Sequence, residues 1–253
     1  MGTTKKPDIW LAHRRPNPQA GLRLFCFPYA GGGASIFRSW HEYLPTQIEV
    51  CPIQLPGREN RLRERPYKRL TEVIDALADS LPPILDKPFA FFGHSLGALI
   101  GFELARQLRQ RAMPQPVHLF VSGARAPQIP DPKAPIHNLP DKEFVEAVRD
   151  FGGTPEEVLQ HEELMEILLP CLRADFEVCE THIYQPGDPL SIPITAFGGW
   201  QDKKIAPDEI EAWRNQTLSS FVVRMFPGNH FFLHNVREEL LLHISGALNL
   251  TSH

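Results

Sequence analysis

Short apolar runs alternate with longer amphipathic stretches along most of the chain. Each run is rich in aromatic or β-branched residues and is bounded by Pro or Gly, which is typical of strands. The runs are apolar almost throughout, rather than at alternate positions, and this indicates a sheet covered on both faces. The expected strands span residues 22–28, 48–54, 88–93, 117–123, 192–199 and 220–226.

Helical periodicity occupies several of the segments between these runs. Because strands and helices alternate in order, the chain is predicted to form a mostly parallel α/β sheet with helices on both faces. In such sheets ligands bind beyond the carboxyl ends of the strands, so chemistry is expected in the residues that follow each run. The expected helices span residues 70–85, 96–111, 207–213 and 236–248.

The segment from about residue 124 to residue 189 breaks this rhythm, because it contains no convincing strand. It opens with a proline-rich stretch and continues with helical patterns near residues 141–150, 156–159 and 162–184, the last with an expected break at Pro170. So long an insertion between two strands is unusual. We therefore expect a helical lid, with ordinary helices on one sheet face as the alternative.

Composition narrows the class of protein. The chain has 253 residues, of which 42% are hydrophobic and 22% are charged, and this suits a single globular domain over residues 1–253. A net charge of −4 argues against nucleic-acid binding. The first residues lack the apolar core of a secretory signal, and no stretch is typical of a membrane span. A cytoplasmic protein is therefore expected, with a monomer as the default.

Sites for metals and nucleotides find no support in the sequence. Cys26 and Cys51 lie in apolar runs, while Cys171 and Cys179 are too far apart for a pair of metal ligands. The Gly-rich stretch at residues 31–33 matches neither of the glycine motifs that bind dinucleotides or phosphates. We expect buried thiols in a reducing compartment and no cofactor.

The clearest chemical signal is Ser95, which stands between Gly93 and Gly97 where an apolar run meets a helical pattern. A strand that turns sharply into a helix strains the residue at its tip and needs neighbours without side chains two positions away. This G-x-S-x-G turn is the nucleophile elbow of α/β hydrolases. It exposes the serine oxygen above the sheet, at a helix N-terminus that favours developing negative charge.

A serine hydroxyl is a weak nucleophile unless a base removes its proton and a carboxylate orients that base. In α/β hydrolases the acid and then the histidine follow the serine along the chain. Asp202 lies just past the fifth apolar run, and we favour it as the acid. Asp208 is the rival, although its place beside Pro207 is typical of a helix start.

The base is expected after the last apolar run. His230 follows the turn residues at the end of that run, and we expect it to be the base. His234 is the alternative, four residues further on and inside the next element. His94 stands beside Ser95, but the geometry of an elbow should point its side chain away, so we interpret it as a packing residue.

The reaction of a serine nucleophile also needs backbone donors for the oxyanion. One is expected from the residue after the nucleophile, Leu96, and the second from the loop after the first apolar run. Glycines at residues 31–33 of that loop let its backbone approach a substrate closely. We assign the second donor to Ala30, with Tyr29 as the less favoured choice.

In combination these motifs resemble those of type II thioesterases, stand-alone α/β hydrolases that accompany nonribosomal peptide and polyketide synthetases. The resemblance covers residues 10–248 and rests on LFCFPYAGGGASIFRSW, QLPGRE, FFGHSLGALIGFELA, GGWQDKKI and FPGNHFFLH. It implies hydrolysis of acyl groups from the phosphopantetheine arm of acyl or peptidyl carrier proteins. The usual role in the family is editing, in which stalled or wrongly primed acyl groups are removed.

The resemblance also assigns roles, residue by residue. It implies Ser95 as nucleophile, His230 as base and Asp202 as acid, with Ala30 and Leu96 as the oxyanion donors. The family often has histidine where this chain has Tyr29. The helical insertion at residues 124–189 corresponds to the mobile lid of the family.

One strongly basic stretch lies at residues 56–70. Its ordinary interpretation is a solvated surface. The sharper interpretation is that Arg61, Arg63 and Arg65 contact an acidic carrier domain or the phosphate of its arm. Arg58 is expected to be structural instead, fixing the turn after the second apolar run.

Rival functions share parts of this pattern. A chain-terminating hydrolase of fatty acid synthesis has the same triad and would prefer long saturated chains. An oxygen-ester lipase fits the L-P-G-R and triple-glycine motifs less well. The non-enzymatic alternative is a carrier-protein binding module without activity, in which Ser95 would not react with a fluorophosphonate probe.

Overall fold

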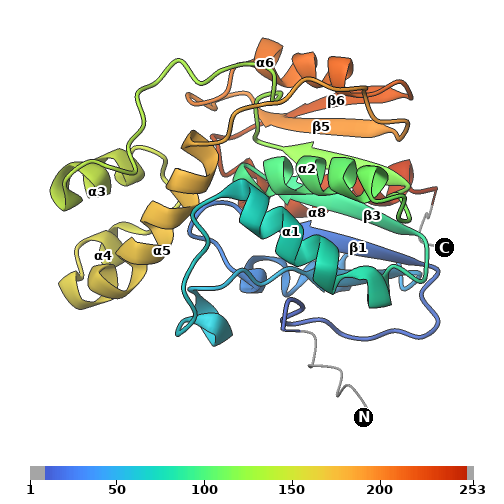
Figure 1. Ribbon diagram of the computed structural model, residues 1–253, viewed down its shortest axis with the longest axis horizontal. Helices are drawn as coiled ribbons and strands as arrows, with labels where there is room; N and C mark the ends of the chain where they lie inside the picture. The colour runs from blue at the N-terminus through green and yellow to red at the C-terminus, as the bar shows by residue number, and fades with distance from the viewer. Residues whose placement is uncertain (1–8, 250–253) are drawn as a thin grey trace.

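Six parallel strands form the frame of the molecule, in the order β2-β1-β3-β4-β5-β6. The computed structural model describes residues 9–249, and Figure 1 shows the strands side by side with helices on both faces of the sheet. The predicted mostly parallel α/β-hydrolase sheet is confirmed. The strands are β1 (Leu22–Phe27), β2 (Ile48–Pro52), β3 (Phe89–His94), β4 (His118–Ser122), β5 (Ile194–Gly199) and β6 (Phe221–Phe226).

The helices follow the expected order along the chain; the helix at residues 156–159 has the expected bounds, and the other expected helices are shorter. The α-helices are α1 (Leu70–Ser80), α2 (Leu96–Gln110), α3 (Asp141–Arg149), α4 (Glu156–Leu159), α5 (Glu162–Glu180), α6 (Pro207–Glu211), α7 (Phe232–Asn235) and α8 (Arg237–Ala247). The 3-10 helices are η1 (Ala34–Phe37), η2 (Trp40–Glu42), η3 (Glu59–Arg61), η4 (Pro82–Ile84) and η5 (Ala212–Gln216).

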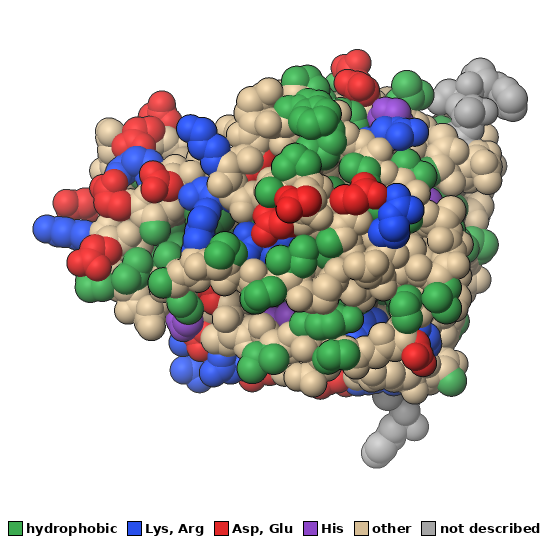
Figure 2. Space-filling model, turned by 90° about the horizontal axis from the view of Figure 1, so that it is seen from above, with side chains coloured by type: hydrophobic (Ala, Val, Ile, Leu, Met, Phe, Trp, Pro, Cys, Tyr) green, Lys and Arg blue, Asp and Glu red, His purple; other side chains and the backbone are tan. Residues whose placement is uncertain are grey.

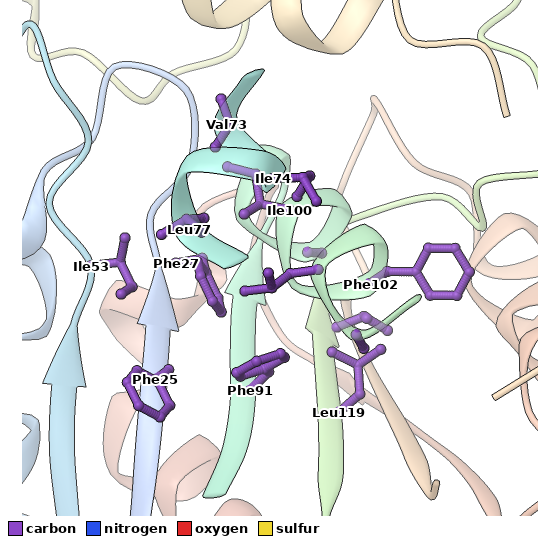
Figure 3. Close-up of a cluster of buried hydrophobic side chains, with 14 of the residues drawn as sticks. Phe25, Phe27, Ile53, Val73, Ile74, Leu77, Phe91, Ile100, Phe102 and Leu119 are labelled. Atoms are coloured by element: carbon purple, nitrogen blue, oxygen red, sulfur yellow. The ribbon is translucent and has the colours of Figure 1, made fainter. Parts of the chain in front are cut away.

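Alternate side chains of the central strands enter two apolar layers. On one face Phe27 and Phe91 pack beneath α1 and α2, as Figure 3 shows. On the other face Phe92 lies 4.7 Å from Trp40 between ring centroids and joins a layer that includes residues of α8. This double coverage explains why the first five strands are buried at every position.

The edge strand β6 departs from the predicted burial on both faces. Its side chains alternate in exposure, and Val222 and Arg224 are exposed. One face of this edge strand is left in contact with solvent, whereas β2, at the opposite edge of the sheet, is buried at every position. The prediction that both faces of this strand are buried, which rested on its apolar sequence, is therefore wrong for β6.

The segment between β4 and β5 carries α3, α4 and α5, which share an apolar cluster of their own that includes Phe144 and Phe176. The expected break at Pro170 is wrong, because α5 continues through it. A proline removes one helical hydrogen bond, and burial of Met165 before it and Leu172 after it holds both parts of the helix in place. The helix ends at Glu180, earlier than the expected residue 184.

These three helices project together at the end of the sheet toward which the strands point, on the left of Figure 1. Figure 2 shows charged side chains of both signs mixed with apolar ones on the same projecting end. Within residues 9–249, no helix combines the length and the apolar character needed to cross a membrane. The expectation of no secretory signal rests partly on residues 1–8, which lie outside the described residues.

Helix α2 approaches the end of β1 so closely that Gly97 has no room for a side chain. A Cβ there would overlap the carbonyl oxygen of Phe27, and a backbone atom of a central strand cannot move aside. We expect Gly97→Ala to lower the free energy of unfolding by about 1–3 kcal/mol, as overpacking does, measured by urea denaturation.

Gly101, one turn further along α2, provides the matched control. A Cβ there would lie 3.5 Å from Leu119 Cδ1, an ordinary contact. Gly101→Ala should therefore leave stability unchanged or raise it by up to about 1 kcal/mol, through helix propensity. Equal losses in the two variants would contradict this account of the packing between α2 and β1.

Candidate active site

Ser95 occupies the single-residue turn between β3 and α2. Its backbone has φ 53° and ψ −117°, a strained conformation for a residue with a side chain. A Cβ on Gly93 would overlap the backbone of Gly97, so the turn requires glycine at that position. The Ser95 amide donates to the carbonyl oxygen of Ser122 at 2.8 Å, which ties the turn to the end of β4.

Asp202 and His230 follow the neighbouring strands β5 and β6, and their side chains meet. His230 Nδ1 lies 2.7 Å from Asp202 Oδ2, with both side chains buried. The other carboxylate oxygen accepts from the amides of Lys204 at 2.7 Å and Ile205 at 3.2 Å. Burial acts to raise the pKa of Asp202, but the bonds from His230 and these amides outweigh it and leave the pKa below its usual value.

The ionised carboxylate fixes the tautomer of His230. It accepts a hydrogen bond, so the proton of the neutral ring lies on Nδ1 and Nε2 is left as the basic nitrogen. The His230 ring lies 5.3 Å from the ring of His94, centroid to centroid. His94 directly precedes Ser95, so the structure brings the Asp202–His230 pair to the strand end that carries the serine.

The rival residues lie in other settings. Asp208 is exposed in the first turn of α6, where an acidic side chain complements the helix dipole. His234 lies in α7, and its Nε2 is 3.0 Å from the hydroxyl of Tyr29. His94 is fully buried with Nδ1 at 2.9 Å from Ser122 Oγ, which agrees with its interpretation as a packing residue.

The two amides expected to bind an oxyanion, those of Leu96 and Ala30, are unengaged. Among the hydrogen bonds of residues 9–249, neither amide acts as a donor. Leu96 is the first residue of α2, where helical amides lack an internal partner. The close approach of Gly97 to the carbonyl of Phe27 brings the start of α2 against the loop that contains Ala30.

A buried carboxylate on α5, that of Asp175, was not predicted from the sequence. Asp175 Oδ2 accepts from the Gly31 amide at 2.7 Å, and both carboxylate oxygens pair with Arg58. Arg58 also donates to the carbonyl of Pro56, in keeping with the structural role expected for it. A charged residue on the buried face of an amphipathic helix is the signal that could have identified Asp175.

Arg61 does not belong to an exposed carrier contact, and this part of the prediction is corrected. Its side chain is 5% exposed. It pairs with Glu64, donates to the carbonyl of Gln54 and stacks over Trp10 at 4.5 Å. Arg63 and Arg65 remain exposed. The alternation of buried and exposed arginines in this stretch depends on η3, which sequence periodicity did not reveal.

Residues of the β4–β5 segment cover the pair of Asp202 and His230. The ring of Phe151, between α3 and α4, lies 6.1 Å from the His230 ring. Lys204 Nζ lies over the same Phe151 ring, 4.2 Å from its centroid. A cavity of about 10 Å³ adjoins Leu96 and is lined in part by Arg58 and Asp175. A larger surface hollow of about 590 Å³ is lined by residues of α6, η5 and β6, and none of the proposed site residues lines it.

Comparison with known proteins relates these features to one family. Residues 22–248 match the thioesterase domain model. The chain belongs to this thioesterase family. It is similar to the gramicidin S biosynthesis protein GrsT of Aneurinibacillus migulanus, with 51% identity covering 95% of this chain and 94% of that protein.

Solved structures of thioesterases agree with the fold. RedJ, a thioesterase of the prodiginine pathway in Streptomyces coelicolor, is 45% identical with a TM-score of 0.85 over 90% of each chain. BorB, a type II thioesterase of the borrelidin cluster, is 35% identical with a TM-score of 0.85 over 94% of this chain and 96% of that one. The resemblance to type II thioesterases is confirmed, and the chain is a thioester hydrolase. The inactive binding module is therefore not favoured.

His94 generates a prediction about stability and pH. Burial, and then the nearby His230 and His234, lower its pKa well below the usual 6.5. Below about pH 6.5 His94 is therefore protonated in the unfolded chain but stays neutral in the folded protein. The stability due to neutral His94 is present above that pH and is lost as the pH falls toward the folded pKa, at about 1.4 kcal/mol per pH unit.

His94→Gln removes this proton uptake while keeping a polar partner for Ser122. In urea denaturation at a series of pH values, its free energy of unfolding should fall less steeply than that of wild type below about pH 6.5. Parallel pH slopes for the two proteins would contradict a neutral, buried His94.

Proposed function

We propose that this thioesterase removes acyl groups from the phosphopantetheine arm of carrier proteins and so edits a nonribosomal peptide or polyketide synthetase. The observation that carries the proposal is the hydrogen bond of 2.7 Å between Asp202 and His230 beside the Ser95 turn. The 51% identity with a gramicidin S biosynthesis protein supports the substrate class and favours editing over chain termination in fatty acid synthesis. A monomer in the cytoplasm, where such synthetases act, completes the proposal.

The proposed reaction begins with Ser95. His230 Nε2 takes the hydroxyl proton as Ser95 Oγ attacks the thioester carbonyl, and Asp202 stabilises the imidazolium that forms. The amides of Ala30 and Leu96 donate to the oxyanion. Collapse of this intermediate breaks the carbon–sulfur bond and leaves the acyl group on Ser95, while the proton on His230 goes to the departing thiolate.

The second half of the reaction releases the acid. A water molecule gives a proton to His230 Nε2 and attacks the acyl-serine carbonyl. The second oxyanion intermediate collapses to a carboxylic acid, and Ser95 recovers its proton from His230. A thiol with a pKa near 8.5 leaves more readily than an alcohol, so these residues suffice for the chemistry without a cofactor.

The β4–β5 segment is proposed to act as the lid over the acyl group. Contact between Phe151 and His230 covers the site, and the cavity beside Leu96 of about 10 Å³ has room for about one water molecule. An acyl chain therefore requires side chains of α5 or its neighbours to move. Such opening would leave the sheet and the Asp202–His230 pair in place.

The triad assignment predicts the effect of single substitutions. Ser95→Ala, His230→Ala and Asp202→Asn should each lower kcat for an acylated carrier protein by about 10⁴-fold or more. Asp208→Asn, the rival acid, should retain wild-type kcat because Asp208 lies exposed on α6. The free thiol released on the carrier arm gives the readout. Retained turnover in Ser95→Ala, or loss in Asp208→Asn, would overturn the assignment.

The carrier contact is proposed to involve Arg63 and Arg65. Reversing both charges should raise KM for an acylated carrier protein by about five- to tenfold, because exposed charges steer association. Turnover of a small acyl-pantetheine thioester should not change.

A matched control reverses the same number of charges elsewhere, at Arg214 and Arg224, which are exposed on η5 and β6. This control variant should have wild-type KM and turnover for both the acylated carrier protein and the small thioester. If the Arg63 and Arg65 variant affects the carrier protein and the small thioester equally, these arginines are not a carrier contact.

A further inference from the structure

The loop after β1 carries the proposed oxyanion donor Ala30 and forms a tight turn. The Gly32 amide donates to the carbonyl oxygen of Tyr29 at 2.9 Å. Gly31 has φ +78°, while Ala30 is not among the residues with positive φ. A four-residue turn with positive φ at its third position alone is a type II turn. Its central peptide consists of the Ala30 carbonyl and the Gly31 amide.

A carboxylate from α5 holds this central peptide. Asp175 Oδ2 lies 2.7 Å from the Gly31 nitrogen. Arg58 neutralises the carboxylate through bonds of 2.5 and 2.8 Å and also donates to the Gly32 carbonyl at 3.2 Å. The side chains of Asp175 and Arg58 are both almost fully buried, so water competes little for these bonds.

The bond to Gly31 selects one of two turn conformations. Types I and II differ by a flip of the central peptide, which exchanges the positions of its N–H and its carbonyl oxygen. In the flipped form the Ala30 carbonyl would point at the Asp175 carboxylate, which repels it. Asp175 therefore stabilises the conformation in which Gly31 donates. This sets the rotation about the Cα–C bond of Ala30 and holds its Cα in place, and the Ala30 amide, which belongs to the preceding peptide, is attached to that Cα.

Apolar contacts place the same loop against α5. A Cβ on Gly31 would overlap the side chain of Leu172, one turn before Asp175 on α5. The Ala30 side chain packs against both the main core cluster and the cluster shared by α3, α4 and α5. The loop is thus seated between the sheet and α5 by polar and apolar contacts together.

We propose that Asp175 is a positioning residue of the reaction: by holding the Gly31 amide it fixes the neighbouring Ala30 amide where an oxyanion can accept from it. This inference rests on the proposed function, in which Ala30 is an oxyanion donor. It also has a consequence for regulation. Because Asp175 belongs to α5, the donor is in position when α5 is docked on the loop and is released when α5 moves away.

The variants Asp175→Ala and Arg58→Met/Asp175→Leu test the proposal. The double variant replaces a buried ion pair by apolar side chains, a change that proteins often tolerate. The single variant Arg58→Met is the reference against which the added effect of Asp175→Leu is measured. Complete loss of one oxyanion donor lowers kcat by about 10²–10³-fold. A displaced donor should have a smaller effect, so kcat should fall by about 10–100-fold in both Asp175 variants, with KM within about twofold of wild type.

Two inhibitors separate positioning from general damage to the site. An alkyl trifluoromethyl ketone forms an anionic tetrahedral adduct with a reactive serine, whereas an alkyl pantetheine thioether resembles the bound substrate and forms no oxyanion. Affinity for the ketone should fall by the same factor as kcat. Affinity for the thioether should not change, and thermal denaturation should show a folded protein.

Glu177→Gln is the matched control on the same helix. Glu177 pairs with Lys68 at 3.2 Å and with Arg69 at 3.7 Å, so it joins α5 to the body of the protein. Among residues 9–249, neither of these ion pairs involves the loop after β1. This variant should keep the wild-type kcat and ketone affinity. If it loses both as Asp175→Ala does, the effect belongs to the docking of α5 in general and the proposal is overturned.

Other outcomes also decide. Wild-type kcat and ketone affinity in the folded Asp175 variants would overturn the proposal, as would equal losses for the ketone and the thioether. Failure of both variants to fold would assign Asp175 to stability and overturn it as well. In each case the proposed function stands if Ser95→Ala abolishes hydrolysis, whereas turnover by Ser95→Ala would remove the proposed function itself.

Discussion

The sharp turn from β3 into α2 is the constraint on which the rest of the site depends. One residue, Ser95, makes that turn in a strained conformation, and the surrounding structure must hold it there. Gly93 and Gly97 allow the backbones to approach, and the bond from the Ser95 amide to Ser122 ties the turn to the next strand. The two apolar layers that pack on the faces of the sheet around β3 stabilise the fold enough to hold this strained residue.

Parallel strands bring the remaining groups to the same edge. Asp202 and His230 follow β5 and β6, the loop with Ala30 follows β1, and all these strand ends meet where the β4–β5 segment projects. The Asp202–His230 bond orients the imidazole, and the first turn of α2 supplies amides and a favourable dipole. The β4–β5 segment adds two contacts to these groups. Phe151 packs on the ring of His230, and Asp175 accepts a hydrogen bond from the Gly31 amide in the loop after β1.

The sequence could predict most of the frame and the positions of Ser95, Asp202 and His230, because strand ends and turn residues are local signals. It could predict a structural role for Arg58 but not its pairing with Asp175, because the two residues lie 117 positions apart in the chain and no local pattern links them. The predicted break at Pro170 was wrong because tertiary packing before and after the proline keeps α5 continuous. The predicted exposure of Arg61 was wrong because a turn of 3-10 helix determines which arginines of the basic stretch face inward.

The central claim is that Ser95 carries the acyl group between the two halves of the reaction. Rapid mixing of the protein with an acyl-pantetheine thioester, acid quenching within milliseconds, and mass spectrometry of the digested protein test it most directly. The account predicts a mass increase equal to the acyl group on the peptide that contains Ser95, which forms and decays within one turnover. An acyl group found on another residue, or turnover without any acylated peptide, would contradict it.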